Sequence, residues 1–296
     1  MAGREAVRRE AVGPVSGPGW PPPPTGFVLA PEGTRAVYVA EPLEADVRTR
    51  GLFSWDGWDR ALASGSDGSG RGVSAVVPGS ANTRWRLKRM RRGGLAARLW
   101  SDRYPSAKRL VAVLDATATA AARGVPTGRP VALIVEAEAS GLVLGALACE
   151  EIEGVEDLAK RVTGGTLTRA ELSAAIAAVR TMHDRGIVHP DLNLGNLLVR
   201  GRPGASPEAF VIDFDKAEIL DGPAPFAVRQ SALRRLERSC AKLTGRTGPL
   251  GDGSGDLWYS IYAGDDAELA KRFARGRGVG RVALAAHRLG WKRRNS

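Results

Sequence analysis

The fold of this chain is decided by one stretch, Ile187-Val-His-Pro-Asp-Leu-Asn-Leu-Gly-Asn-Leu-Leu-Val199, and by the later segment Val211-Ile-Asp-Phe-Asp215. In both, polar residues stand next to apolar runs. Two of these runs, Leu197–Val199 and Phe210–Ile212, are short and strand-like, and a segment rich in Gly, Pro and Ser separates them. This order predicts a β-hairpin that begins directly after the first group of polar residues.

A helix is predicted directly before this stretch. Thr168-Arg-Ala-Glu171 has the spacing of a capping box, in which the Thr and Glu side chains satisfy backbone amides at the start of a helix. Apolar residues then recur at helical intervals, which predicts a helix that ends near Gly186. The apolar stripe consists of Leu172, Ile176, Val179 and Met182.

The polar residues between the helix and the hairpin have the spacing H-x-D-L-x-x-x-N, followed by Asp-Phe, which is typical of kinase catalytic loops. Phosphoryl transfer requires an acceptor hydroxyl in line with the γ-phosphate of ATP and a divalent metal ion on the phosphate oxygens. We expect Asp191 to orient the hydroxyl and take its proton. Asn196 and Asp213 would supply the oxygen ligands that Mg²⁺ prefers. His189 is expected to be structural, and the alternative for the whole set is that these residues form turns only.

The front of the chain is predicted to be rich in strands. The runs Val73–Val77 and Trp85–Lys88 flank a turn that contains Pro, Gly and Asn, which indicates a hairpin. Residues 106–123 are rich in Ala and Leu and predict a helix that stops at a Gly. Two further strands are predicted at Val131–Val135 and Leu142–Leu147.

A glycine-rich run precedes the first hairpin, and we expect its Gly68, Gly70 and Gly72 to bring backbone N–H groups over the phosphates of ATP. Lys88 is the candidate for contacting the α- and β-phosphates. The alternatives are a flexible linker for the glycines and membership of a general basic run for the lysine. Asp115 is the only acidic residue in the following helix that could pair with Lys88.

The order of elements predicts an α+β fold with strands at the front of the chain and helices at the back. With the kinase-type loop, it indicates a protein-kinase-like, two-lobed fold with a small β-rich N-lobe and a mostly helical C-lobe. We expect a disordered Pro-rich arm at residues 1–26, the N-lobe at 27–154, and the C-lobe with the catalytic loop and a basic tail at 155–296.

Composition restricts the functional class. Hydrophobic residues make up 43% of the chain, but no apolar run reaches the roughly 18 residues that span a bilayer, and no signal-peptide pattern is present, so a cytoplasmic location is expected. The two cysteines and three histidines have no metal-binding spacing. A formal net charge of +11 favours an anionic partner, with a general arginine bias as the alternative. Specific nucleic-acid binding is not expected, because no binding motif is present and only 6% of the residues are aromatic.

Over about residues 68–245 the chain resembles the lipopolysaccharide kinase family. The resemblance implies a protein-kinase-like fold, ATP and Mg²⁺ as cofactors, and phosphorylation of a hydroxyl of 3-deoxy-D-manno-octulosonic acid (Kdo) on a lipid A precursor. It also implies work at the cytoplasmic face of the inner membrane. The segments that carry it are Gly70–Gly72, Leu87–Leu95, Asp102–Tyr104, Arg123–Pro126, His189–Asn193, Ile212–Asp215 and Arg235–Ser239.

Two features favour a small-molecule or glycolipid acceptor over a protein. Asn193 stands where protein Ser/Thr kinases usually carry Lys, and only 83 residues follow Asp213, without an Ala-Pro-Glu motif. Another small-molecule or protein Ser/Thr kinase of the same fold is the alternative enzyme. A non-catalytic pseudokinase scaffold is the alternative outside enzymes, and the presence of both Asp191 and Asp213 weighs against it.

Basic residues are concentrated in two segments. Ten Lys or Arg and one acidic residue lie between Arg84 and Arg109, and nine basic residues with no acidic one lie from Lys271 to the C-terminus, which closes with Trp291-Lys-Arg-Arg294. Basic residues near an anionic leaflet contribute about 1 kcal/mol each, and Trp favours the membrane interface. We therefore expect peripheral attachment to an anionic membrane surface, with a solvated basic surface as the alternative.

Overall fold

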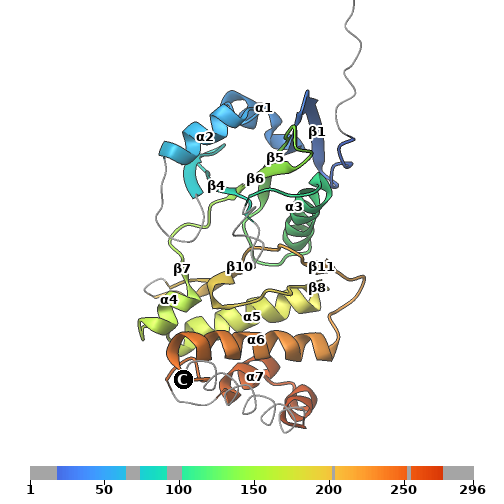
Figure 1. The fold of residues 1–296 in the computed structure, drawn as a ribbon. Helices are drawn as coiled ribbons and strands as arrows, with labels where there is room; N and C mark the ends of the chain where they lie inside the picture. The colour runs from blue at the N-terminus through green and yellow to red at the C-terminus, as the bar shows by residue number, and fades with distance from the viewer. Residues whose placement is uncertain (1–18, 65–73, 92–101, 202–203, 252–254, 276–296) are drawn as a thin grey trace, which may run out of the picture. The chain divides into compact units, whose positions relative to one another are not determined.

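The computed structural model describes residues 19–64, 74–91, 102–201, 204–251 and 255–275 (Figure 1). These residues form two compact units. The first contains residues 1–115 and 130–151, and the second contains residues 116–129 and 152–296. The chain therefore leaves the first unit within one helix and returns to it for two strands.

The first unit is built on a six-stranded antiparallel sheet with the strand order β1-β2-β5-β6-β4-β3. Alternating side chains enter the core, and β5 is buried along most of its length. The strands are β1 (Phe27–Glu32), β2 (Arg35–Ala40), β3 (Ser74–Pro78), β4 (Arg84–Arg89), β5 (Pro130–Ala137) and β6 (Val143–Glu150).

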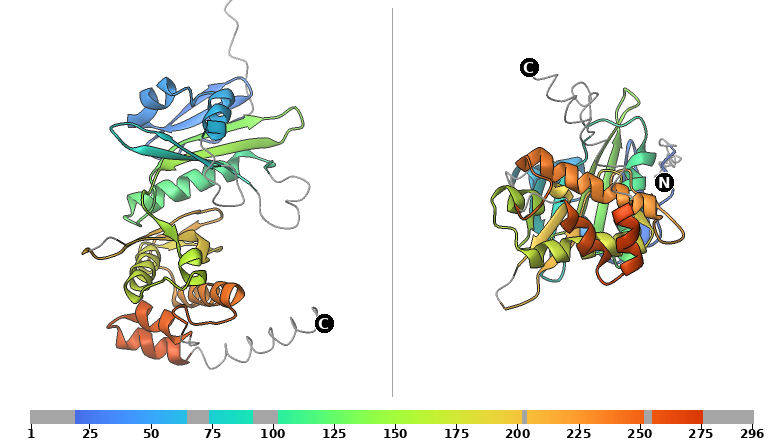
Figure 2. Two further views of the ribbon diagram at one scale, coloured as in Figure 1. Left: turned by 90° about the vertical axis from the view of Figure 1, so that its left-hand side faces the viewer. Right: turned by 90° about the horizontal axis from the view of Figure 1, so that it is seen from below.

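Two short helices, α1 (Glu44–Thr49) and α2 (Trp55–Ser64), follow β2 and the 3₁₀ turn η1 (Glu41–Leu43), and they cover one face of the sheet (Figure 2). Trp58 of α2 is fully buried in one cluster with Trp85 of β4. The indole nitrogen of Trp58 donates to the carbonyl of Leu52 at 2.8 Å, so its polar atom is satisfied inside the core.

Helix α3 (Ala107–Ala122) covers the opposite face of the sheet (Figure 2). Leu110 lies so close to Gly145 of β6 that a Cβ atom on the glycine would come within 2.8 Å of the leucine side chain. The helix ends where Gly124 takes a φ of +78°, a conformation that glycine adopts without strain. The predicted stop at this glycine is confirmed.

The second unit is mostly helical, and its core joins residues from its helices and from short strands around the catalytic loop. Helix α5 packs against β9 and β10 and also against α7. The helices are α4 (Leu158–Thr163), α5 (Arg169–Asp184), α6 (Phe226–Thr244) and α7 (Asp256–Ala263), and the strands are β7 (Glu156–Asp157), β8 (Ile187–Val188), β9 (Leu197–Arg200), β10 (Glu208–Val211) and β11 (Glu218–Ile219).

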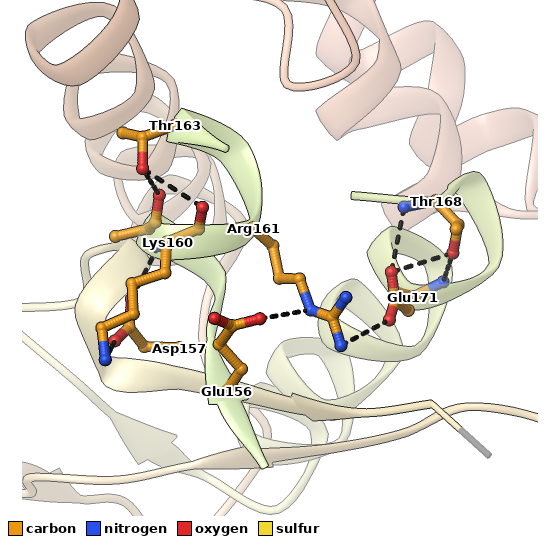
Figure 3. Close-up of polar contacts among 8 residues, drawn as sticks. Glu156, Asp157, Lys160, Arg161, Thr163, Thr168 and Glu171 are labelled. Carbon is orange, nitrogen blue, oxygen red and sulfur yellow. Dashed lines mark hydrogen bonds and ion pairs between the residues drawn. The ribbon is translucent and has the colours of Figure 1, made fainter. Parts of the chain in front are cut away.

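The predicted capping box begins helix α5. The Thr168 hydroxyl accepts from the amide of Glu171 at 3.2 Å, and the Glu171 carboxylate accepts from the amide of Thr168 at 3.0 Å. Arg161 of α4 forms ion pairs with Glu171 at 3.5 Å and with Glu156 of β7 at 2.8 Å (Figure 3). Glu171 is only 4% exposed, so its charge needs a partner inside the protein. The Arg161 guanidinium and the N-terminus of α5 provide it.

The fold class agrees with the sequence analysis: a β-rich unit and a mostly helical unit make an α+β protein. Both predicted hairpins and the helix over 106–123 are confirmed. The domain bounds 1–26, 27–154 and 155–296 stay a prediction. Residues 1–18 of the predicted arm lie outside the described residues. The described part of the arm contacts the first unit, because the carbonyl of Pro21 accepts a hydrogen bond from the Tyr38 hydroxyl at 2.8 Å.

No helix in the described part of the chain is both long enough and apolar enough to cross a membrane.

Candidate active site

The predicted catalytic loop, which contains His189, Asp191 and Asn196, begins at a tight turn between α5 and β8. Gly186 takes a φ of +74°, and a Cβ atom there would lie 2.5 Å from the carbonyl oxygen of Gly222 and 2.7 Å from that of Leu220. Its own carbonyl accepts from the amide of Leu220 at 2.8 Å. Only glycine fits this close approach of two backbone segments, so the sequence fixes where the helix ends and the loop starts.

Within the loop, two asparagine side chains bind the backbone of Asp191. Asn193 Nδ2 donates to the Asp191 carbonyl at 2.9 Å, and Asn196 Nδ2 donates to the same oxygen at 3.1 Å. Asn193 Oδ1 also accepts from the amide of Gly195 at 2.9 Å, and this bond caps the 3₁₀ turn η3 (Leu194–Asn196). The Asp191 carboxylate takes no part in these bonds and is exposed. The side-chain amides of Asn193 and Asn196 therefore hold the backbone of the loop, and the Asp191 carboxylate stays exposed to solvent.

The hairpin of β9 and β10 brings Asn196 next to the segment that carries Asp213. Leu197 pairs with Val211, and the Asn196 carbonyl accepts from the amide of Ile212 at 3.0 Å. Asp213 follows at once, is exposed, and takes a φ of +67°, which is uncommon for a residue other than glycine. Such strain is concentrated at functional sites, where the surroundings hold it. The structure thus brings Asp191, Asn196 and Asp213 into one region of the second unit.

His189 connects the catalytic loop to this same segment. Its Nε2 donates to the carbonyl of Ile212 at 3.1 Å, and its ring packs on Phe214 with centroids 5.6 Å apart. The side chain is 1% exposed, and this burial lowers the pKa of His189 below its ordinary value, although Asp213 and Asp191 oppose the shift. A buried, neutral imidazole that donates to a carbonyl fits the structural role expected for it.

Other elements hold the loop in ways that sequence reasoning did not identify. Ser239 Oγ of α6 accepts from the amide of Leu194 at 3.3 Å. The Arg123 guanidinium, after α3, donates to the carbonyls of Arg185 and Leu220 at 2.8 and 2.7 Å. Arg123 and Ser239 stand in segments that carry the family resemblance, but a single sequence contains no signal that they contact the loop.

The predicted phosphate-binding residues belong to the first unit. Lys88 is exposed on β4, where it pairs with Ser74 of β3 and Leu147 of β6. Asp115 is exposed and forms no ion pair with any residue in the described ranges. The proposed Lys88–Asp115 pair is therefore not formed. The contact of Lys88 with the phosphates of ATP stays a prediction, as do the roles of the other site residues.

Gly68, Gly70 and Gly72 lie outside the described residues. Helix α2 ends at Ser64, directly before this glycine-rich run, and β3 begins at Ser74. The run therefore joins a helix to a strand, and its contact with phosphates stays a prediction.

The residues present fit a magnesium ion carried by a nucleotide. Mg²⁺ binds through one or two carboxylates together with phosphate oxygens and waters. Asn196 uses its amide nitrogen for the bond to Asp191, which leaves its side-chain oxygen as an acceptor. Asp213 adds an exposed carboxylate on the neighbouring segment. Over the described ranges, no three His, Cys, Asp or Glu side chains gather as a metal site, and a site that uses an asparagine and one carboxylate does not need three.

An antiparallel sheet followed by a helical unit, with a polar loop between a helix and a hairpin, is the arrangement expected of a protein-kinase-like phosphotransferase that acts on a hydroxyl. A family model described as lipopolysaccharide kinase (Kdo/WaaP) family matches residues 58–248. The chain belongs to this family.

Individual relatives agree. The chain is 34% identical to a 3-deoxy-D-manno-octulosonic acid kinase of Photobacterium profundum, over 60% of this chain and 73% of that protein. It is 29% identical to the kinase of the same name from Mannheimia succiniciproducens, over 64% and 79% of the two chains. Among solved structures, WaaP in complex with acyl carrier protein matches with a TM-score of 0.46 and 17% identity, over 79% of this chain and 95% of that chain.

Proposed function

We propose that this lipopolysaccharide kinase transfers the γ-phosphate of ATP to a hydroxyl of the Kdo sugar in the inner core of lipopolysaccharide. The observation that carries the proposal is a pair of hydrogen bonds at Asn196. Its side-chain amide donates to the Asp191 backbone carbonyl at 3.1 Å, and its own backbone carbonyl accepts from the amide of Ile212, the residue before Asp213, at 3.0 Å. One residue thus fixes the base and the metal-binding segment against each other. The names of the relatives support Kdo as the acceptor.

In the proposed reaction, the acceptor hydroxyl lies beside the exposed carboxylate of Asp191, which takes the proton as the oxygen bonds to the γ-phosphorus. The bond between this phosphorus and the bridging oxygen breaks, and ADP leaves. A Mg²⁺ ion held by Asn196 and Asp213 would neutralise charge on the phosphate oxygens. His189 keeps the loop and the Ile212–Asp213 backbone together throughout.

ATP binding is proposed to use Lys88 and the glycine-rich run before β3. Lys88 would contact the α- and β-phosphates, and Gly68, Gly70 and Gly72 would cover them.

We also propose that the protein works as a peripheral enzyme at the anionic, cytoplasmic face of the inner membrane, where its glycolipid acceptor would be anchored. The net charge of +11 supports this. Part of the first basic segment is already neutralised: Arg86 pairs with Glu151, Arg89 with Asp59, and Arg103 with Glu138. The basic segment from Lys271 to the C-terminus, which closes with Trp291-Lys-Arg-Arg294, is proposed to contribute as well.

Incubation with labelled ATP, Mg²⁺ and a panel of acceptors tests the proposed function. The panel contains Kdo-lipid A, free Kdo, an aminoglycoside and a generic protein. Label on Kdo-lipid A or Kdo is the expected result. Transfer only to the aminoglycoside or the protein, with none to either Kdo acceptor, would contradict the choice of substrate.

A further inference from the structure

Helix α6 presents one side to the catalytic loop. The hydroxyl of Ser239 accepts from the amide of Leu194, and Leu194 stands between Asn193 and Asn196 in the loop. Residues four apart lie on the same face of a helix, with Cβ atoms about 5–6 Å apart. Arg235 is one turn before Ser239 and therefore lies on the same side of α6, at the edge of the buried stripe that contains Ala232 and Leu236.

Arg235 differs from the other arginines of α6. Arg229 binds the carbonyl of Ala224 at 2.7 Å and the Tyr262 hydroxyl at 3.2 Å, and Arg238 is exposed. Arg235 is half-buried, and its side chain has no hydrogen bond or ion pair with any residue in the described ranges. A guanidinium that is partly removed from water without an acceptor is unfavourable, so this position is suited to an anionic ligand.

An acceptor that is itself an anion would be favoured by a positive side chain close to Asp191. The exposed carboxylates of Asp191 and Asp213 would repel an acceptor that is itself an anion. Arg235 lies close enough to the buried ring of His189, two residues before Asp191, to lower the pKa of that histidine. The carboxylates of Asp213 and Asp191 act in the opposite direction and raise it. Lys216 also lies on this segment, but it is exposed, and its attraction would be screened by water.

We propose that Arg235 binds the carboxylate of the sugar acid and thereby places the acceptor hydroxyl beside Asp191. This inference rests on the proposed function, and it adds the group by which the acceptor is recognised. Arginine matches a carboxylate with two parallel N–H donors, which fixes the orientation as well as the position of a bound sugar acid.

The test compares the wild type with Arg235→Gln on two acceptors, a Kdo glycoside and the same glycoside with its carboxylate converted to the uncharged amide. We expect Arg235→Gln to lower kcat/KM for the acid by roughly 10- to 100-fold, as for the loss of a charged hydrogen bond. The rate on the amide should change by less than about threefold. Arg235→Lys should fall between wild type and Arg235→Gln, because it keeps the charge but not the paired donors.

Arg238→Gln is the matched control, since it removes the same charge from the exposed side of α6 and should leave both rates unchanged. Affinity for a fluorescent ATP analogue and the thermal unfolding midpoint should be the same in all variants. Equal losses on the acid and the amide would overturn the proposal, because they would indicate a structural role only. A third acceptor, Kdo-lipid A with its phosphates, distinguishes the other anionic source: if Arg235→Gln lowers kcat/KM on this acceptor but not on the phosphate-free Kdo glycoside, the arginine binds lipid phosphate and the carboxylate assignment is wrong. If the wild type phosphorylates none of these acceptors, it is the proposed function that fails.

Discussion

Gly186→Ala should destabilise the second unit strongly, because it combines a left-handed backbone with close backbone contacts. The backbone at this residue has a φ of +74°, and a left-handed conformation costs a residue other than glycine about 1–2 kcal/mol. The new Cβ would also lie 2.5 and 2.7 Å from two backbone carbonyl oxygens, which belong to Gly222 and Leu220. Backbone atoms cannot move aside as a flexible side chain can, so overpacking adds about 1–3 kcal/mol. The expected loss in the free energy of unfolding is roughly 2–5 kcal/mol.

Gly245→Ala is the matched control. Gly245 ends helix α6 with a φ of +73°, and a Cβ there would have nothing within 4 Å. This variant should lose only the conformational part, about 1–2 kcal/mol. Urea unfolding followed by far-ultraviolet circular dichroism measures both losses. Equal destabilisation by the two substitutions would refute the claim that close approach at Gly186 fixes the start of the catalytic loop.

Three further results are expected. Asp213→Asn tolerates the positive φ but removes the charge, so it should abolish Mg²⁺-dependent binding of a fluorescent ATP analogue. Asn196→Ala should weaken this binding less. Unchanged metal dependence in Asp213→Asn would exclude Asp213 as a metal ligand. Burial lowers the pKa of His183 to about 3, so the stability from this neutral histidine is present above an unfolded pKa of about 6.5 and is lost as the pH falls toward 3. His183→Gln should accordingly flatten the fall in unfolding free energy between about pH 7 and pH 4, and a slope equal to that of the wild type would contradict this. Deletion of residues 288–296 should reduce sedimentation with anionic vesicles, and equal binding to neutral and anionic vesicles would argue against the membrane proposal.

Local sequence signals were sufficient where a short segment determines its own structure. The capping box at Thr168 and Glu171 and the glycine at residue 124 marked the start of α5 and the end of α3 because each acts within one or two turns of its helix. The catalytic loop was located in the same way, since Asp191 and Asn196 belong to one turn stabilised by its own side chains.

Contacts between distant segments were not predictable from one sequence. The bonds of Arg123 to the carbonyls of Arg185 and Leu220 span 62 and 97 residues and use backbone acceptors, which carry no sequence signature. The bond from Leu194 to Ser239 is of the same kind. Helices α1 and α2 were also missed, because their burial depends on the sheet that they cover.

The central claim is that Asp191 acts as the base, and turnover by Asp191→Ala tests it most directly. The asparagines bind the backbone carbonyl of this residue, so the substitution removes the carboxylate and leaves the bonds at 2.9 and 3.1 Å in place. The rate of phosphate transfer to Kdo should fall by about 10²–10⁴-fold, while the affinity for ATP should change little. Transfer within a few-fold of the wild-type rate would contradict it.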